Sequence, residues 1–247
     1  MASKEYYEGR DMEKNSVLHS YLKKTHGYDS VKSDGKNSTK GDIIAEKNGE
    51  KISHSLKCVS GKNTQVHLTT IKKLSSDLNI PNDVNSSLVV WLGSNDDVEF
   101  NSWSKDIVLT NYEKDHNRLS SHNIQNWNQV ENWFNENNKN YSLPKLLIES
   151  LKRDSVSKIL LWYNKKSKVL QSLDIPKLID FIGSHCKWIT MPTGTILKCI
   201  TPDNKPILWL QMKGNRTDDG YNHCPQFHIV ANWPENVVLA RKVVDFL

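Results

Sequence analysis

Residues 40–57, KGDIIAEKNGEKISHSLK, are the stretch that most clearly decides the expected fold of this chain. Two short runs with apolar side chains, 42–45 and 52–59, lie on either side of Asn48-Gly49. Asn-Gly is a preferred two-residue turn between antiparallel strands, because both of its positions readily adopt a positive φ. The stretch therefore predicts a β-hairpin whose adjacent strands bring Asp42 and Lys57 close together.

Asp42 and Lys57 are residue types that suit the metal-assisted cleavage of a phosphodiester. A carboxylate ligates a hard divalent cation through oxygen, and a nearby ammonium group holds or polarises the water that attacks phosphorus. An Asp and a Lys fifteen residues apart also occur on ordinary solvated hairpins, so this spacing predicts catalysis only together with other residues.

Outward from the hairpin, apolar periodicity and turn residues predict the other elements. Upstream, helical spacing over 10–25 predicts a first helix that ends near Gly27. Downstream, we expect a polar loop and helix over 62–78, a buried strand over 87–92, a helix around 127–134, a strand over 158–163, a helix over 174–182, a hairpin of 193–200 with 207–212, and a last helix over 234–246.

Length and composition favour a single domain over 1–247, with a polar, Trp-rich helical insertion at about 95–155. The net charge of +5, from 33 Lys and Arg against 28 Asp and Glu, permits a polyanionic partner without requiring one. The four cysteines form no CxxC pair and the apolar runs are too short to cross a bilayer. We therefore expect a cytoplasmic protein with free thiols.

Glu13 is a further carboxylate of interest, on the expected first helix. It lies four and eight residues before Val17 and Tyr21, which places it on the side of the helix expected to face the core. A buried carboxylate needs a cation or a hydrogen-bonding partner. The alternative is a solvated first turn, where acidic residues are favoured by the helix dipole.

These residues, taken in order, resemble the PD-(D/E)XK nucleases. The resemblance is carried by Glu13-Lys14, Gly41-Asp42-Ile43, Ser55-Leu56-Lys57 and the stretch 211–216, QMKGNR, and it runs from about residue 8 to 229. More narrowly, these residues resemble the branch of small type II restriction endonucleases typified by the HinP and Msp enzymes, in which an uncharged residue often precedes x-Lys. The resemblance implies an α/β fold with a restriction-endonuclease-like core, a mixed central β-sheet flanked by helices.

The resemblance also implies catalytic roles for Asp42, Ser55, Lys57 and Glu13. Asp42 corresponds to a ligand of Mg²⁺ and Lys57 to the group that positions the attacking water, while Glu13 corresponds to an outer or second-metal carboxylate. Ser55 departs from the family pattern, since a hydroxyl is a neutral and weaker ligand than an acid. The expected products are 5′-phosphate ends.

DNA contacts are expected in two segments. Bidentate donors such as Arg, Lys, Asn and Gln read base edges in the major groove, and the last stretch of the resemblance offers several of them; an exposed basic turn is the alternative interpretation. A loop that leaves the catalytic strand begins near the scissile phosphate. The expected DNA-binding residues are Gln211, Lys213, Asn215, Arg216, Lys62, Asn63, Gln65 and Lys72.

The function that the sequence predicts is Mg²⁺-dependent cleavage of double-stranded DNA at a short specific site, as in a restriction-modification system with a separate DNA methyltransferase. Both a two-fold homodimer and a monomer are compatible with such a site. A structure- or lesion-directed repair nuclease and a non-catalytic DNA-binding protein with a decayed site are the alternatives. Zinc is disfavoured, because the spacing of His185-Cys186 and His223-Cys224 fits no finger.

Overall fold

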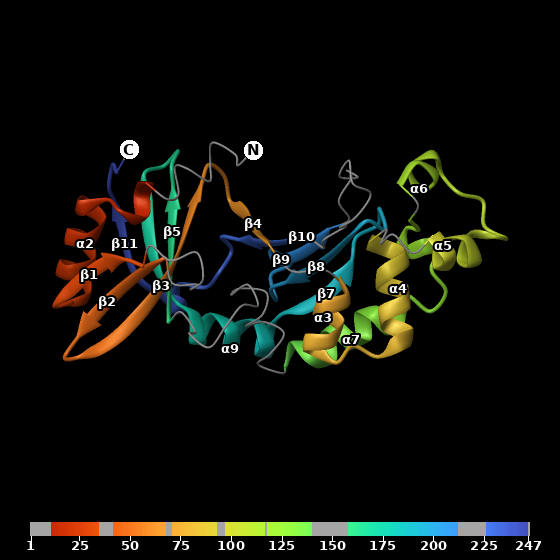
Figure 1. Cartoon of the computed structure of the whole chain (residues 1–247), viewed down its shortest axis with the longest axis horizontal. Helices are drawn as coiled ribbons and strands as arrows, with labels where there is room; N and C mark the ends of the chain where they lie inside the picture. Colours follow the sequence, from red (N-terminus) through yellow and green to blue (C-terminus); the bar gives the residue numbers. More distant parts are fainter. Residues whose placement is uncertain are drawn as a thin grey trace. The chain divides into compact units, whose positions relative to one another are not determined.

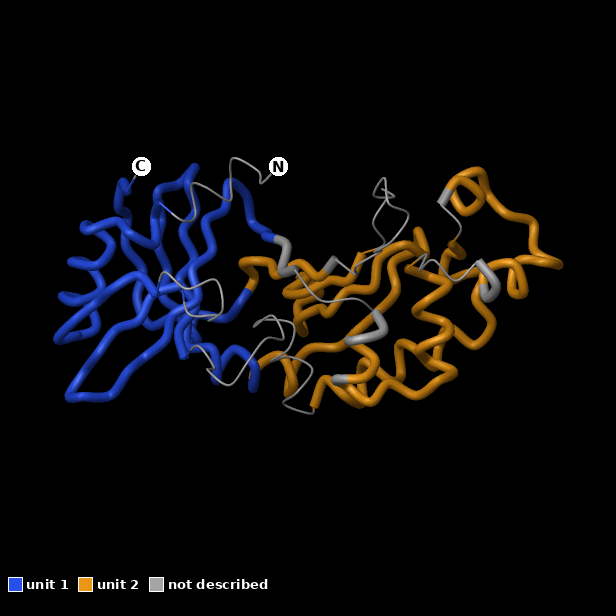
Figure 2. The backbone as a smooth tube through the Cα atoms, viewed as in Figure 1, with its two compact units in different colours: residues 1–64, 149–180, 233–247 blue, residues 65–148, 181–232 orange. Residues whose placement is uncertain are grey.

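In a computed structural model, the chain divides into two compact units, each of which is described by itself below. Unit 1 comprises Met1–Thr64, Glu149–Asp180 and Trp233–Leu247, and unit 2 comprises Gln65–Ile148 and Phe181–Asn232 (Figure 2). The structure describes residues 11–34, 42–67, 71–92, 97–116, 118–139, 158–211 and 226–246. Whether the two units fold as the single domain expected from the sequence stays a prediction.

Unit 1 is built on a six-stranded mixed sheet with the order β1-β2-β3-β5-β6-β11 (Figure 1). Neighbouring strands are antiparallel except for β3 and β5, which run parallel, with Ser55 opposite Leu160 and Lys57 opposite Trp162. The strands are β1 (Ser30–Ser33), β2 (Ile43–Lys47), β3 (Glu50–Val59), β5 (Ile159–Asn164), β6 (Val169–Asp174) and β11 (Val238–Val243).

The β2–β3 hairpin confirms the prediction made from Asn48-Gly49. Both turn residues have a positive φ, 52° at Asn48 and 79° at Gly49, and Lys47 pairs directly with Glu50 across the turn. This two-residue loop matches the right-handed twist of the strands. The resulting register places Ile43 opposite His54, so Asp42, the residue before β2, lies opposite Ser55.

The first helix is α2 (Ser16–His26), and it begins later than the sequence predicted. The Asn15 side chain accepts hydrogen bonds from the backbone N–H groups of Val17 and Leu18 and caps the helix. A separate helical turn at 11–13 precedes it. The cap resets the helical phase, so Val17 is 53% exposed and the expectation that it faces the core is wrong.

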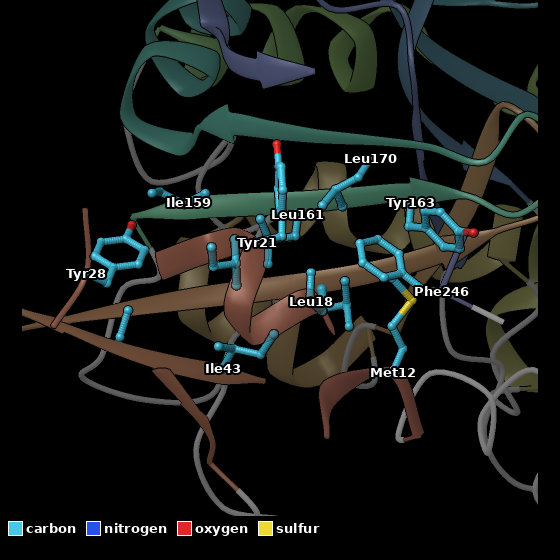
Figure 3. Close-up of a cluster of buried hydrophobic side chains, with 13 residues drawn as sticks. Met12, Leu18, Tyr21, Tyr28, Ile43, Ile159, Leu161, Tyr163, Leu170 and Phe246 are labelled. Atoms are coloured by element: carbon cyan, nitrogen blue, oxygen red, sulfur yellow. The ribbon is translucent and has the colours of Figure 1, made fainter. Parts of the chain in front are cut away.

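The core of unit 1 lies between α2 and one face of the sheet. Leu18 and Tyr21 from the helix pack against Ile43, Leu161 and their neighbours from the strands, as Figure 3 shows. Because side chains alternate along a strand, Leu56 turns toward this core while its neighbours Ser55 and Lys57 turn to the other face.

Unit 2 holds a five-stranded sheet with the order β4-β10-β9-β8-β7, and the described pairs from β7 to β10 are antiparallel. α7 packs against β7, and the Trp188 ring lies 4.9 Å from the Phe134 ring. The strands are β4 (Asn63–His67), β7 (Lys187–Thr190), β8 (Ile196–Ile200), β9 (Pro206–Gln211) and β10 (Gln226–Val230). The described helices of unit 2 are α3 (Ile71–Leu78), α4 (Asn82–Leu92), α5 (Asp97–Ser104), α6 (Asn111–His116), η1 (Ser121–Asn123) and α7 (Asn128–Asn138). Helix α9 (Ile175–His185) begins in unit 1 and ends in unit 2, and η2 (Glu235–Val237) belongs to unit 1.

The strand expected over 87–92 is wrong, because this apolar run forms the second half of α4. Leu88, Val90, Trp91 and Leu92 are all buried, and a run that is apolar all round shows no helical period. The helix begins just after Pro81, whose carbonyl accepts the N–H of Asn85 at 2.8 Å, and proline is favoured at a helix start.

The last helix, expected over 234–246, is also wrong. After the short turn η2, Val238–Val243 form β11, which pairs antiparallel with β6. The segment is rich in β-branched valine, which suits a strand, and the free edge of β6 offers it backbone partners. Other predictions hold: the strand at β5, the helices at α7 and α9, and the β8–β9 hairpin agree with the structure. The expected α/β class, a mixed central sheet flanked by helices, is confirmed.

Candidate catalytic site

Asp42, Ser55 and Lys57 come together at the start of β2, as the hairpin predicted. The Asp42 N–H donates to the His54 carbonyl at 2.9 Å, which ties this residue to the middle of β3. Its carboxylate accepts the backbone N–H of Leu56 through Oδ2 and is also hydrogen-bonded by the Ser55 side chain. The Asp42 carboxylate therefore accepts a backbone N–H of β3 that a longer β2 strand would otherwise pair with.

Burial dominates the electrostatics of Asp42 and raises the pKa of its carboxyl group. The positive charge of Lys57 and the hydrogen bonds from Leu56 and Ser55 act in the opposite direction and lower this pKa. The Lys57 ammonium group thus acts electrostatically on the Asp42 carboxylate.

Asp34 is the residue of this site that the sequence prediction missed. It follows β1 directly, and its N–H donates to the Asp42 carbonyl at 3.2 Å. Its negative charge is a further cause that raises the pKa of Asp42. The signal was weak in the sequence, because β1 is short and the stretch 33–41 reads as a connection rich in Gly and Ser.

Glu13 lies on the helical turn before α2 and is half-buried. Its backbone carbonyl is hydrogen-bonded to Nε2 of His19 at 2.7 Å. Both Glu13 and Asp42 act on the Cys58 thiol, whose pKa rises to about 12, first because of burial and then because of these two negative charges. Glu13 and Asp42 thus both act electrostatically on Cys58, and a role of Glu13 in the site stays a prediction.

Next to Ser55 in β3, His54 forms a buried aromatic pair with Tyr28. Tyr28 Oη and His54 Nε2 share a hydrogen bond of 2.9 Å, and the two rings meet edge to face. Burial, assisted by the neighbouring charge of His26, lowers the pKa of His54 to about 4. His54 is therefore neutral near pH 7 and packs as part of the wall on which Ser55 is held.

The donor set at Asp42 suits a magnesium ion in its chemistry. Mg²⁺ in proteins is commonly held by one or two carboxylates, while water and substrate phosphate complete the octahedron. Asp42 and Asp34 offer two carboxylates side by side. Within the described ranges, no three or more His, Cys, Asp and Glu side chains gather closely enough to hold a metal, so Glu13 does not join the two aspartates in such a cluster.

The expected DNA-binding residues fall partly on described elements. Lys62 and Asn63 are exposed where β3 leads into β4. Gln65 lies on β4 and Lys72 on α3. Gln211 ends β9 and is half-buried, whereas Lys213, Asn215 and Arg216 lie outside the described residues.

The strand face that carries Gln211 also carries an aromatic pair that the sequence did not indicate. Trp209 of β9 stands opposite His228 of β10 and Lys198 of β8, and the Trp209 and His228 rings stack at 4.9 Å. Burial lowers the pKa of His228. Within the part of the chain that the structure describes, the indole N–H and both imidazole nitrogens are buried and have no hydrogen-bond partner.

Comparison with known proteins gives one structural likeness to report. No protein-family model matches the chain, and no curated protein matches it in sequence. Among solved structures, the chain is similar to the restriction endonuclease MspI in complex with its cognate DNA, at 11% identity and a TM-score of 0.41, over 85% of this chain and 76% of that one. In the described part of the chain, no helix has the length and apolarity needed to span a membrane.

Proposed function

We propose that this chain is a magnesium-dependent DNA endonuclease of the type II restriction kind, which hydrolyses double-stranded DNA at a short specific site. The observation that supports this most is the meeting of Asp42, Ser55 and Lys57 on β2 and β3. A buried carboxylate, a hydroxyl bonded to it and an ammonium group within its electrostatic reach suit metal-assisted phosphodiester hydrolysis.

Each residue has a distinct part in the proposed reaction. Asp42 would hold a Mg²⁺ ion, which when bound would polarise a water and compensate charge on the phosphate. Lys57 holds the attacking water and offsets the charge that develops on phosphorus oxygens. Ser55 donates its hydrogen bond to Asp42 and fixes the orientation of the carboxylate. Glu13 serves as an outer carboxylate.

A second group of residues is proposed to recognise the DNA sequence through contacts to base edges. Gln211, at the end of β9, is able to make a bidentate contact to adenine, and Lys213, Asn215 and Arg216 extend this set in the sequence. Lys62 and Asn63, with Gln65 and Lys72, are proposed to contact phosphates. These phosphate contacts contribute affinity that falls with salt.

A digestion of plasmid DNA of known sequence tests the proposal. The parent protein with Mg²⁺ is expected to give discrete fragments with 5′-phosphate ends at one short sequence, and Asp42→Ala and Lys57→Ala are expected to give none. Lys51→Ala is the matched control, because Lys51 lies exposed on the same strand β3 and the change removes the same charge.

The remaining outcomes favour the alternatives. Cutting at random or only at junctions and lesions would replace sequence specificity with a repair or recombination activity. Binding of DNA without Mg²⁺-dependent cutting by the parent, or cutting that Asp42→Ala and Lys57→Ala leave unchanged, would overturn the catalytic role of the site and favour a non-catalytic DNA-binding protein.

A further inference from the structure

Asp34 and Asp42 occupy facing positions on two paired strands. β1 and β2 are antiparallel, with Ser33 opposite Ile43, so the residue after β1 faces the residue before β2. The hydrogen bond from the Asp34 N–H to the Asp42 carbonyl, at 3.2 Å, holds the two backbones in this arrangement. Asp34, Asp42 and Ser55 therefore follow one another across three adjacent strands.

One oxygen of the Asp34 carboxylate lacks a hydrogen-bond donor among the described residues. This atom, Oδ2, is fully buried. A buried carboxylate oxygen without a donor is costly, commonly by about 1–3 kcal/mol or more. Such an atom in a native fold calls for a partner, and the neighbouring side chain, Asp42, repels it.

The groups that counter the negative charge at this pair act on Asp42. Lys57, the Leu56 N–H and the Ser55 side chain all favour the charged form of Asp42. Lys57 thus brings one positive charge to Asp42, and Asp34 beside it brings a second negative charge. Two carboxylates in one buried site are stabilised by a divalent cation between them.

We propose, building on the nuclease function proposed above, that Asp34 is a second protein ligand of the same divalent cation. β1 would then supply the negative charge that β3 lacks at Ser55. The cation gains a second anionic oxygen ligand, which a serine hydroxyl does not provide. The neutral Ser55 is thereby compatible with a working metal site.

Binding of Mn²⁺ or Mg²⁺ to the DNA-free protein tests this assignment without reference to activity. Isothermal titration and the cation-induced rise in melting temperature are measured for the parent, Asp34→Asn and Asp42→Asn. Asp180→Asn is the control, because Asp180 is exposed on α9 in unit 1 and the change removes the same charge. Asn is close in shape to Asp, and the melting temperature in EDTA reports whether each variant is folded.

We expect Asp34→Asn to weaken Mn²⁺ binding at least about 10-fold, which corresponds to about 1.4 kcal/mol. The variant should also lose most of the cation-induced rise in melting temperature, and it should melt no lower than the parent in EDTA, since the change removes a repulsion. Asp180→Asn should behave like the parent.

Two results would overturn the assignment of Asp34 as a ligand. Only the second of them would also overturn the nuclease proposal. If Asp34→Asn binds Mn²⁺ like the parent while Asp42→Asn does not, Asp34 is not a ligand and the nuclease proposal stands. If the parent binds neither Mn²⁺ nor Mg²⁺, both alone and in the presence of an uncleavable DNA duplex, both proposals fail together.

Discussion

Each unit of this protein contains a buried carboxylate, and the two have opposite surroundings. In unit 2, Glu113 of α6 is 1% exposed and its two oxygens accept four hydrogen bonds, from the Thr110 N–H and hydroxyl, the Ser120 N–H and the Asn123 amide. Burial alone would raise the pKa of Glu113, but these bonds hold it at about 2.

In unit 1, burial outweighs the groups that stabilise charge on Asp42, and its pKa is raised. Asp34 beside it adds a second negative charge and an oxygen without a donor. Nearby residues thus supply Glu113 with hydrogen-bond donors, and we interpret its role as structural. The pair in unit 1 is a place where charge has been retained against the stability of the fold, which is typical of functional sites.

The largest expected effect in this comparison is on cleavage by Asp42→Asn. The change removes the charge of the proposed metal ligand and leaves its shape, so the rate of DNA cleavage should fall at least about 1,000-fold, or about 4 kcal/mol in the barrier. Single-turnover cleavage of a plasmid in Mg²⁺ measures it. Glu113→Gln should cleave at the parent rate below its melting temperature, and equal losses in both variants would erase the distinction between the two carboxylates.

Glu113→Gln is expected to lower the free energy of unfolding by about 2 kcal/mol at pH 7, because an amide NH₂ group then faces N–H and O–H donors. The folded-state pKa of about 2 lies below the ordinary 4.5. The stabilisation is therefore complete above about pH 4.5 and is lost as the pH falls toward 2. Urea unfolding at several pH values measures this window.

Glu136→Gln is the control for that measurement, since Glu136 is exposed on α7 in the same unit. Its effect should stay within about 0.5 kcal/mol. A difference between parent and Glu113→Gln that grows on acidification would show that the hydrogen bonds to Glu113 do not stabilise its charged form.

Gln211→Ala should have a smaller effect, confined to sequence recognition. If Gln211 contacts one base, its loss should reduce discrimination at that position by about 1–3 kcal/mol while cleavage at the best site continues. Sequencing of the cut ends from a library of randomised sites measures this. Unchanged preference at every position would remove Gln211 from the proposed base-reading set.

The smallest effect is on the stability of unit 1 without cation. In EDTA at pH 7, Asp42→Asn should melt at the same temperature as the parent or slightly above it, because burial disfavours the charge that the change removes. This is the opposite sign to Glu113→Gln. A marked fall in the melting temperature would show that Asp42, like Glu113, is primarily structural.

The sequence predicted those residues of the site whose positions depend on a local turn. Asn48-Gly49 sets a two-residue turn, and this turn fixes the register that brings Asp42 to Ser55 and Lys57. Asp34 depends on the pairing of β1 with β2 across a long connection, for which no local pattern exists. Glu13 was placed by helical periodicity, which the cap at Asn15 interrupts.

The same distinction applies to the fold. α9 and the β8–β9 hairpin were predictable because proline, turn residues and apolar spacing agree within a short stretch. The run at 87–92 is buried on all sides and so gives no period, and β11 becomes a strand only because β6 offers an edge. Tertiary contacts decide such segments, and a single sequence does not reveal them.

The most direct test of the central claim is the cleavage rate of Lys57→Met at saturating Mg²⁺, measured beside its binding of the same DNA. We expect the variant to bind Mg²⁺ and DNA like the parent, because Lys57 is not a proposed metal ligand, and to cleave at least about 1,000-fold more slowly. Cleavage by Lys57→Met at the parent rate, or a parent protein that does not cleave DNA at any Mg²⁺ concentration, would contradict it.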